Sequence, residues 1–255
     1  MTQLINNIVN WIKDYAVSNS METLVVGVSG GIDSAVVSAL CAKTGMPVYA
    51  VSMPIKQINT QHDLSVKHGT WLTEQFTNVT HKIIDLDTVY NAFKFEMQID
   101  FNNQHAFANS KSRLRMVTLY QIAGATKGIV VGTGNKVEDF GVGFYTKYGD
   151  GGVDISPIAD LMKSEVYTIA KQLKIDQAII DAEPTDGLWE DGRTDKDQLK
   201  GLTYDQMEQA MLLDEDIATE FGHDQKEKDL LKTYYEIRKP NLHKMNPIPI
   251  FKKTE

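Results

Sequence analysis

The feature that most constrains this chain is a glycine-rich octet between two apolar segments, Gly-Val-Ser-Gly-Gly-Ile-Asp-Ser over Gly27–Ser34. The segment that leads into it, Thr23–Val28, is short, apolar and rich in β-branched residues, which predicts a buried parallel strand. The segment that follows, Asp33–Thr44, predicts a helix. A strand, a glycine turn and a helix in this order favour an α/β fold with an anion at the helix N-terminus.

The octet has the chemistry of a phosphate site. Glycines let backbone N–H groups approach an anion, and the helix start adds unpaired N–H groups. The hydroxyl groups of Ser29 and Ser34 can donate to phosphate oxygens. Asp33 cannot bind a phosphate directly, so it indicates a Mg²⁺ ion between carboxylate and phosphate. The octet lacks the lysine and the spacing of a Walker A loop. The alternative is a plain turn whose helix is capped by Ser29 or Asp33.

The octet resembles the pyrophosphate-binding loop of the N-type ATP pyrophosphatases. This superfamily includes NAD, GMP, asparagine and argininosuccinate synthetases and tRNA-thiolating enzymes. Its members cleave ATP between the α and β phosphates and adenylate an oxygen of the substrate. The resemblance therefore implies that ATP is bound by Gly27, Val28, Ser29, Gly30, Gly31, Ile32, Asp33 and Ser34. The loop alone does not choose among the members of the superfamily.

Strand-like and helix-like segments alternate along the rest of the chain. Further strands are predicted at Pro47–Ser52, His81–Ile84 and Gly128–Gly132, and a loop at Asn103–Ser110. The predicted helices are Gln61–Phe76, a short one from Thr88, Arg113–Ala125, Lys163–Leu173, Tyr204–Phe221 and Gln225–Ile237, before a tail at Arg238–Glu255. This alternation predicts a doubly wound, mainly parallel sheet with helices on both faces and ligands beyond the strand ends. The resemblance implies five strands, an adenine nucleotide alpha-hydrolase-like fold and a single domain over residues 1–255.

Further segments, spread over most of the chain, resemble NAD synthetases in particular. Asn109–Met116 resembles the family's N-x-x-x-R-x-R-M helix, which implies that Arg113 contacts deamido-NAD (nicotinic acid adenine dinucleotide). Without the resemblance, two arginines on a solvated helix face would be the preferred interpretation. Gly132–Glu138 follows a predicted strand, and the resemblance implies that its Thr133 binds ATP and its Glu138 binds Mg²⁺.

The predicted metal ligands come from two strand ends. Asp33 and Glu138 together with phosphate oxygens would suit an octahedral Mg²⁺ site, whereas Glu138 alone could be an exposed loop acid. Gly134-Asn135 stands where many family members have Asp-His, and it resembles another branch of the same family.

The most family-specific stretch is Phe144–Asp154. The resemblance implies that its Lys147 and Asp154 bind deamido-NAD and that its Asp150 helps to place ammonia. A glycine-rich turn is the alternative interpretation. Lys163 follows shortly after, and the resemblance implies that it reaches the ATP phosphates, although a surface charge would look the same in the sequence.

Two later segments extend the resemblance. Thr185 is implied to contact ATP, and the polar stretch over residues 184–202 is long for a connection inside a compact domain, which indicates a mobile lid. Lys200 is an extra residue between a leucine and a glycine that the family usually joins directly, so the alignment there stays open. His243-Lys244 resembles a pair that binds deamido-NAD, with Met245 in place of the usual arginine; a solvated basic tail is the alternative.

Taken together, these motifs are similar to those of ammonia-dependent NAD synthetases. The resemblance implies ATP-dependent amidation of deamido-NAD with ammonia, through an adenylated intermediate, to NAD, AMP and pyrophosphate. Catalysis would depend on positioning and charge stabilisation by Mg²⁺ and protein groups, the implied residues being Asp33, Glu138, Lys163 and Asp150. Glutamine-using versions carry an amidase domain with a catalytic cysteine. The single cysteine, Cys41, lies in an apolar helical run and is expected to pack, so ammonia is the expected nitrogen donor.

Composition limits the other classes of function. A net charge of −8 argues against coating nucleic acid or an anionic membrane, and so against a tRNA-modifying ligase, which would also need a C-x-x-C pair. No stretch approaches the ~18 apolar residues that span a bilayer, and the first residues do not form a signal peptide. One cysteine cannot form an internal disulfide, which fits the cytoplasm.

Two expectations concern partners and catalysis. A nucleotide-binding module without catalysis would not need Asp33, Glu138 and Lys163 together. The resemblance implies a homodimer, for which the amphipathic helix Leu4–Ala16 is one candidate contact; packing on the chain's own sheet explains the same apolar stripe.

Overall fold

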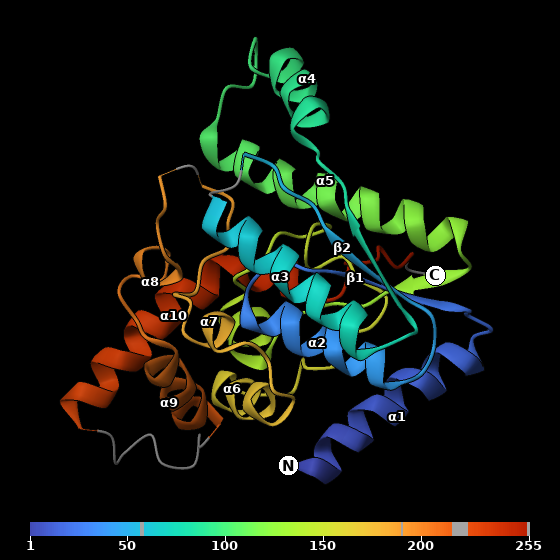
Figure 1. The fold of residues 1–255 in the computed structure, drawn as a ribbon. Helices are drawn as coiled ribbons and strands as arrows, with labels where there is room; N and C mark the ends of the chain where they lie inside the picture. Colours follow the sequence, from blue (N-terminus) through green and yellow to red (C-terminus); the bar gives the residue numbers. More distant parts are fainter. Residues whose placement is uncertain (57–58, 190, 216–223, 254–255) are drawn as a thin grey trace.

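A parallel four-stranded sheet in the order β3-β2-β1-β4 forms the centre of the structure, which is a computed structural model (Figure 1). Its strands are β1 (Thr23–Gly27), β2 (Val48–Ser52), β3 (Val79–Ile83) and β4 (Gly128–Val130). The structure describes residues 1–56, 59–189, 191–215 and 224–253. The doubly wound α/β class is confirmed, with four strands among these residues in place of five.

The position beyond β4 shows why a fifth strand is missing. The chain there makes a single parallel bridge, between Val131 and Ile155. The carboxylate of Asp154 accepts the N–H of Val130 at 2.7 Å, so a side chain takes the place of a backbone carbonyl in the ladder. Regular pairing therefore ends after one bridge.

Helices cover both faces of the sheet. One face packs against α1 (Thr2–Ser18), α2 (Ile32–Lys43), α3 (Asn59–Gln75), α6 (Lys163–Gln172) and α7 (Gln177–Ile180), and the other against α4 (Asp87–Met97) and α5 (Gln104–Ala125). Strand side chains alternate accordingly, because successive residues of a strand point to opposite faces. Leu24 and Val26 pack towards α2, and Val25 packs towards α5.

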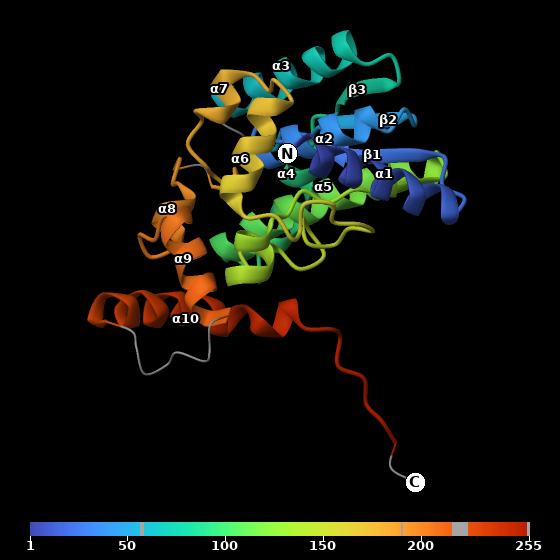
Figure 2. The same cartoon turned by 90° about the horizontal axis from the view of Figure 1, so that it is seen from below.

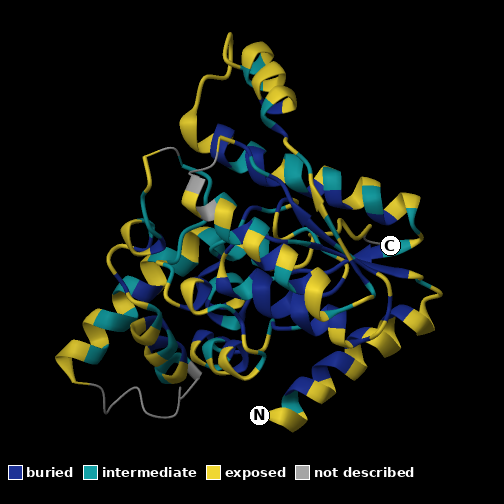
Figure 3. Cartoon of the chain, in the orientation of Figure 1, coloured by how far each residue is buried: buried dark blue, intermediate teal, exposed yellow. Residues whose placement is uncertain are grey.

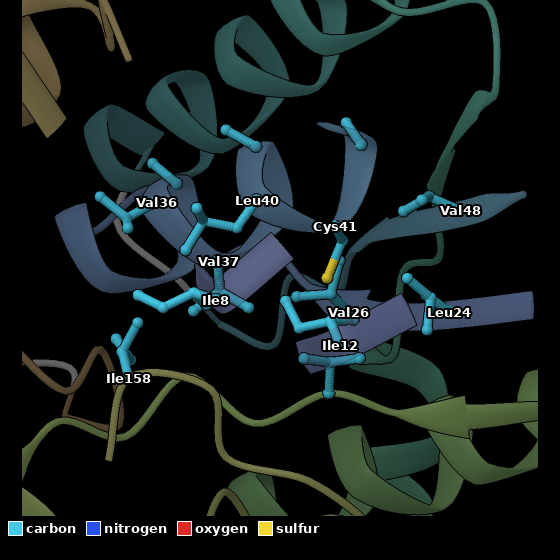
Figure 4. Close-up of a cluster of buried hydrophobic side chains, with 14 of the residues drawn as sticks. Ile8, Ile12, Leu24, Val26, Val36, Val37, Leu40, Cys41, Val48 and Ile158 are labelled. Carbon is cyan, nitrogen blue, oxygen red and sulfur yellow. The ribbon is translucent and has the colours of Figure 1, made fainter. Parts of the chain in front are cut away.

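The larger core cluster lies between the sheet and α1 and α2 (Figure 4). Cys41 is fully buried there, and burial raises the pKa of its thiol to about 12, so it packs as the sequence predicted and stays protonated. The apolar stripe of α1 faces this same core through Ile5, Ile8, Val9, Ile12 and Ala16. Figure 3 shows α2 as the most deeply buried helix, whereas α4 stands out from the body with a largely exposed surface.

A third cluster of apolar side chains joins α9 (Tyr204–Glu215), α10 (Gln225–Met245) and the turn that follows α8 (Asp195–Gln198) to a π-helix, η1 (Lys136–Val142). α10 continues through Pro240, eight residues beyond the predicted end at Ile237. Arg238 donates to the carbonyls of Phe140 and Gly141, and Asn241 Nδ2 donates to that of Val142 (2.9 Å). These contacts hold the helix on both sides of the proline. The tail after Met245 leads away from the body (Figure 2).

Two other predicted boundaries concern the start of α5 and the end of α9. The predicted loop at Asn103–Ser110 is wrong, because the Asn103 side chain accepts from the N–H of Ala106 (2.9 Å) and starts α5 at Gln104. Phe107 and Ala108 in this turn are buried. The predicted end of α9 at Phe221 lies outside the described residues. Within the ranges that the structure describes, no helix has the length and apolar character to span a membrane.

The strand order decides where the loops meet. β1 lies between β2 and β4, so the chain leaves β1 towards one face and arrives at β4 from the other. Ligands of such sheets bind beyond the carboxyl ends of the strands at this switch point. The loops after β1 and β4, which lead into the first turns of α2 with Asp33 and of η1 with Glu138, therefore lie side by side.

Candidate active site

The loop after β1 is shaped by its own hydroxyl groups. The N–H of Ser29 donates to Ser34 Oγ at 3.1 Å, and Ser34 Oγ donates to the carbonyl of Gly31 at 2.9 Å. Gly30 adopts φ = 94°, a conformation that favours glycine. The N-cap of α2 is Gly31 and no described side chain caps this end, so the alternative of a cap by Ser29 or Asp33 is wrong. The N–H groups of the first turn remain available to an anion.

The loop after β4 is organised by Asn135, which is fully buried. Its Oδ1 accepts from the N–H groups of Val137 and Glu138, at 3.0 and 3.1 Å, and so caps η1. Its Nδ2 donates to Oδ1 of Asp33 at 3.1 Å. One amide side chain therefore joins the carboxylate of Asp33 to the backbone of Glu138, the two residues that the sequence predicted as metal ligands.

Lys163, the first residue of α6, joins these carboxylates. Its Nζ donates to Asp33 Oδ2 at 2.6 Å and to Glu138 Oε1 at 2.7 Å, and its side chain is only 3% exposed. Burial alone would lower the pKa of Lys163, but the two carboxylates raise it above its ordinary value, so the ammonium stays charged. Burial raises the pKa of Asp33. Burial also acts to raise the pKa of Glu138, but the charge of Lys163 and hydrogen bonds from Lys163, Tyr204 and Asn135 together lower it below its ordinary value.

One cleft contains all of the predicted catalytic and ATP-binding residues. It is lined by the whole octet Gly27–Ser34 and by Thr133, Glu138, Asp150, Lys163 and Thr185. Residues 182–188 and Asp195 also line the cleft. Asp150 accepts from Ser112 Oγ at 2.6 Å and from the N–H of Thr146 at 3.0 Å. Residues that are about a hundred positions apart in the sequence therefore line the same cleft.

The residues predicted for deamido-NAD lie elsewhere. A second depression is lined by Met116, Val117, Tyr120, Gln121, Tyr148 and Gly152. Asp154 accepts from Tyr120 Oη (3.0 Å), Lys147 Nζ lies 5.5 Å from the Tyr148 ring centre, and Arg113 Nε donates to the carbonyl of Lys147 (3.2 Å). Arg113, Lys147 and Asp154 therefore lie beside this second depression, which shares Met116 with the cleft, and they are not among the residues that line the cleft.

The C-terminal pair is divided between two environments. Lys244 is half-buried against Tyr145, whose carbonyl it contacts at 2.5 Å, and Asp139 and Asp150 are near enough to oppose the lowering of its pKa by burial. His243 is exposed. Lys244 thus approaches the cleft from α10, and its neighbour faces solvent.

A sequence model of the NAD synthase family matches residues 4–247, nearly the whole chain. The chain belongs to the NAD synthase family. An NH₃-dependent NAD⁺ synthetase of Alkaliphilus oremlandii is 39% identical over 211 residues, which are 78% of this chain and 81% of that protein. One from Mesoplasma florum is 36% identical and covers 88% of this chain and 91% of its own length.

Solved structures of this family share the fold. An NMN synthetase from Francisella tularensis is 31% identical, with a TM-score of 0.85 over 98% of this chain and 97% of that one. An NH₃-dependent NAD synthetase from Campylobacter jejuni is 24% identical, with a TM-score of 0.77 over 98% of both chains.

Several groups in and around the cleft of this NAD synthase family member were not predicted from the sequence. Arg115 lines the cleft and donates to the carbonyl of Met53 (3.0 Å), while its predicted neighbour Arg113 does not line it. Asn135, Asp139 and Tyr204 were also missed. Only Arg115 had a signal, since it shares the R-x-R pattern with Arg113. The others depend on contacts between distant segments.

The chemistry of Asp33 and Glu138 fits a divalent cation. A positive group, the Lys163 ammonium, is already held between their oxygens. In the described part of the chain no cluster of three or more His, Cys, Asp or Glu side chains could hold a metal ion. Two carboxylates leave most of an octahedral shell to other oxygens, so the pair suits Mg²⁺ that arrives with phosphates.

Proposed function

We propose that the cleft around Lys163 carries out the reaction of the NAD synthase family, the ATP-dependent amidation of deamido-NAD with ammonia to NAD, AMP and pyrophosphate. The observation that carries this proposal is the buried contact of Lys163 with Asp33 and Glu138, beside the uncapped start of α2. A carboxylate does not react with ammonia, because its oxygen is a poor leaving group. Adenylation makes that oxygen part of AMP, which leaves readily.

The chain's own residues account for the first half of the reaction. The Gly27–Ser34 loop would hold the two phosphates that leave as pyrophosphate, and Lys163 would stabilise the charge that develops on them. Thr133 and Thr185, which line the cleft, would also contact ATP. The nicotinate oxygen forms a bond to the α phosphorus while the bond between that phosphorus and pyrophosphate breaks. Ammonia then bonds to the carbonyl carbon, loses a proton and displaces AMP.

Mg²⁺ is the cofactor that this arrangement calls for. Asp33 and Glu138 would hold it together with phosphate oxygens, and when bound it would neutralise charge on the phosphates. Ammonia would be placed by Asp150, which lies on the wall of the cleft.

The second depression is the proposed position of deamido-NAD beyond its reactive carboxylate. Arg113 and Lys147 supply positive charge there for the pyrophosphate of a dinucleotide, and Asp154 supplies a hydrogen-bond acceptor. His243 and Lys244 would complete this part of the site from α10. Lys244, which is close to Asp150, would connect the depression with the cleft.

One comparison favours a second substrate. The Francisella tularensis protein, 31% identical over nearly the whole chain, is an NMN synthetase. We infer that nicotinic acid mononucleotide, which carries the same nicotinate carboxylate, is the alternative acceptor, with NMN as the product. Nicotinic acid mononucleotide lacks the adenylyl half of deamido-NAD, so it would occupy less of the second depression.

The experiment mixes the purified protein with ATP, Mg²⁺ and ammonium, and adds deamido-NAD or nicotinic acid mononucleotide in separate reactions. Equal amounts of NAD, AMP and pyrophosphate are expected with deamido-NAD. The ratio of the two kcat/KM values then assigns the physiological acceptor. ATP binding without amidation of either substrate would contradict the proposed function.

Three properties of the whole protein are also proposed. Residues 1–255 form one domain in which the segment 184–202 acts as a lid, and the enzyme works in the cytoplasm. It is a homodimer, for which the outer face of α1 offers exposed Trp11 and Tyr15. Light scattering should give twice the chain mass of 28.6 kDa, and a mass of 28.6 kDa would remove the dimer proposal.

A further inference from the structure

Tyr204, the first residue of α9, makes contacts that join different parts of the site. The Lys163 ammonium lies 4.6 Å from the centre of its ring, a cation–π distance. Its hydroxyl group donates to Oδ2 of Asp195 at 2.8 Å. The same hydroxyl also helps to stabilise the ionised form of Glu138 and so lowers the pKa of that carboxyl. Tyr204 therefore contacts the positive centre of the cleft and the segment 184–202 at once.

Asp195 connects this contact with the rest of the segment. Its backbone N–H donates to the carbonyl of Pro184 at 3.1 Å, directly before Thr185 in the wall of the cleft. Its side chain is buried, at 6% exposure for the residue, and lines the same cleft. Oδ1 of Asp195 has no hydrogen-bond partner among the described residues. The bond to Tyr204 thus ties a side chain of this segment to the residues around Lys163.

We propose that Tyr204 is a positioning residue that couples the segment 184–202 to Lys163, so that the ammonium is fully set for ATP only when that segment lies over the cleft. The ring would hold the ammonium in place, and the hydroxyl would hold the segment. The inference rests on the proposed function, because it concerns how Lys163 is presented to the phosphates.

The two contacts of Tyr204 can be separated by substitution. Tyr204→Phe keeps the ring and removes the hydroxyl, and Asp195→Ala removes the acceptor. Each should weaken ATP retention and raise the KM for ATP about tenfold, with kcat changed less than about threefold, since a buried hydrogen bond is worth roughly one factor of ten. Tyr204→Leu also removes the ring and should lower kcat by a further factor of about ten.

Two comparisons between variants test whether Tyr204 and Asp195 act together. The double variant Tyr204→Phe with Asp195→Ala should resemble either single variant, because residues in one hydrogen bond are not additive. Asp195→Asn keeps an acceptor oxygen and should restore the KM for ATP to within about twofold of the unmodified enzyme. Tyr235→Phe is the matched control. It removes a tyrosine–aspartate bond, to Asp214, between α9 and α10 and outside the cleft, and should leave both constants unchanged.

Direct titration of ATP, monitored by calorimetry, gives a dissociation constant that does not depend on turnover. If Tyr204→Phe binds ATP as the unmodified enzyme does, or if the two substitutions are additive, the coupling is wrong. If Tyr204→Leu behaves as Tyr204→Phe, the ring does not position Lys163. Thermal unfolding of each variant separates these results from loss of fold. An unmodified enzyme that makes no amide product would instead contradict the proposed function, and the ATP titration would still decide the coupling.

Discussion

Asp33 and Lys163 are 130 positions apart in the sequence, yet they form one of the shortest buried ion pairs of the described chain, at 2.6 Å. The sequence predicted both residues, but only as a metal ligand and a phosphate contact, and not that they touch. Their contact means that the ammonium lies between the two carboxylates of Asp33 and Glu138 and offsets one of their two negative charges. ATP with its metal ion must then share or displace this ammonium, which is a constraint that no sequence motif contains.

Replacing Lys163 by methionine should expose this competition. Lys163→Met leaves Asp33 and Glu138 without their internal cation, so Mn²⁺ should bind in the absence of ATP, detectable by electron paramagnetic resonance. Turnover should fall by roughly 10²-fold or more, because a preorganised charge is lost. Lys127→Met, which removes an exposed pair with Glu22, serves as the control and should change neither property. No gain in Mn²⁺ affinity would show that Lys163 does not occupy the cation position.

The pKa of Asp195 predicts how the stability of the protein depends on pH. Burial first, and then the charges of Glu138 and Asp186, raise its pKa from 3.8 to about 7, opposed by the hydrogen bond from Tyr204 and by Lys163. The folded protein therefore keeps this proton above pH 4, where the unfolded chain has lost it. Asp195 thus lowers the free energy of unfolding progressively between about pH 4 and 7, and by a constant amount above.

Asp195→Asn removes this titration and keeps the acceptor for Tyr204. The free energy of unfolding of both proteins is measured in urea. The value for Asp195→Asn minus the value for the unmodified protein should rise steadily from pH 4 to 7 and then level off. A difference between the two proteins that does not change with pH would show that Asp195 is not protonated in the folded state.

At the scale of elements, the segments with strong local patterns were predicted well. β1 and α2 follow from an apolar run, a glycine turn and an apolar helix. The start of α5 was missed because polar residues dominate Gln104–Ser112, although Asn103 was a recognisable N-cap. The π-helix η1 has no sequence signature, since Asn135 and the contacts from α10 hold it. Contacts between distant segments thus determine the elements that local sequence patterns did not predict.

Gly134 provides a test of how the loop after β4 is packed. A Cβ at this position would lie 1.9 Å from Oδ2 of Asp139, so the carboxylate of Asp139 occupies the space of a side chain. Gly134→Ala should therefore destabilise the protein by ~1–3 kcal/mol, as overpacking does, and disturb Glu138 next to Asp139. Gly124→Ala, in α5 with nothing within 4 Å of its Cβ, should be neutral or stabilising.

Urea unfolding of both glycine variants measures the two free energies. Adding Asp139→Ala to Gly134→Ala should recover most of the loss, since it removes the clashing carboxylate. An unchanged stability of Gly134→Ala alone would show that Asp139 can move aside at no cost.

At the scale of the whole molecule, alternation predicted the layers but not the strand order, which the sequence supplied only through the resemblance. The order β3-β2-β1-β4 puts the loops after β1 and β4 together, and that is why two motifs a hundred residues apart form one cleft. The division of the site into the ATP cleft and a neighbouring second depression was also not predicted, because Arg113 and Arg115 are indistinguishable in the sequence. The structure places Arg115 in the wall of the cleft, and Arg113 is exposed beside Lys147.

The central claim is that the substrate carboxylate attacks the α phosphorus of ATP in the cleft around Lys163. Deamido-NAD labelled with ¹⁸O in its carboxylate tests this directly, with mass spectrometry of the nucleotide products. One ¹⁸O atom should appear in AMP for each NAD formed, and none in pyrophosphate. Label in phosphate or pyrophosphate, or formation of ADP in place of AMP, would contradict the account.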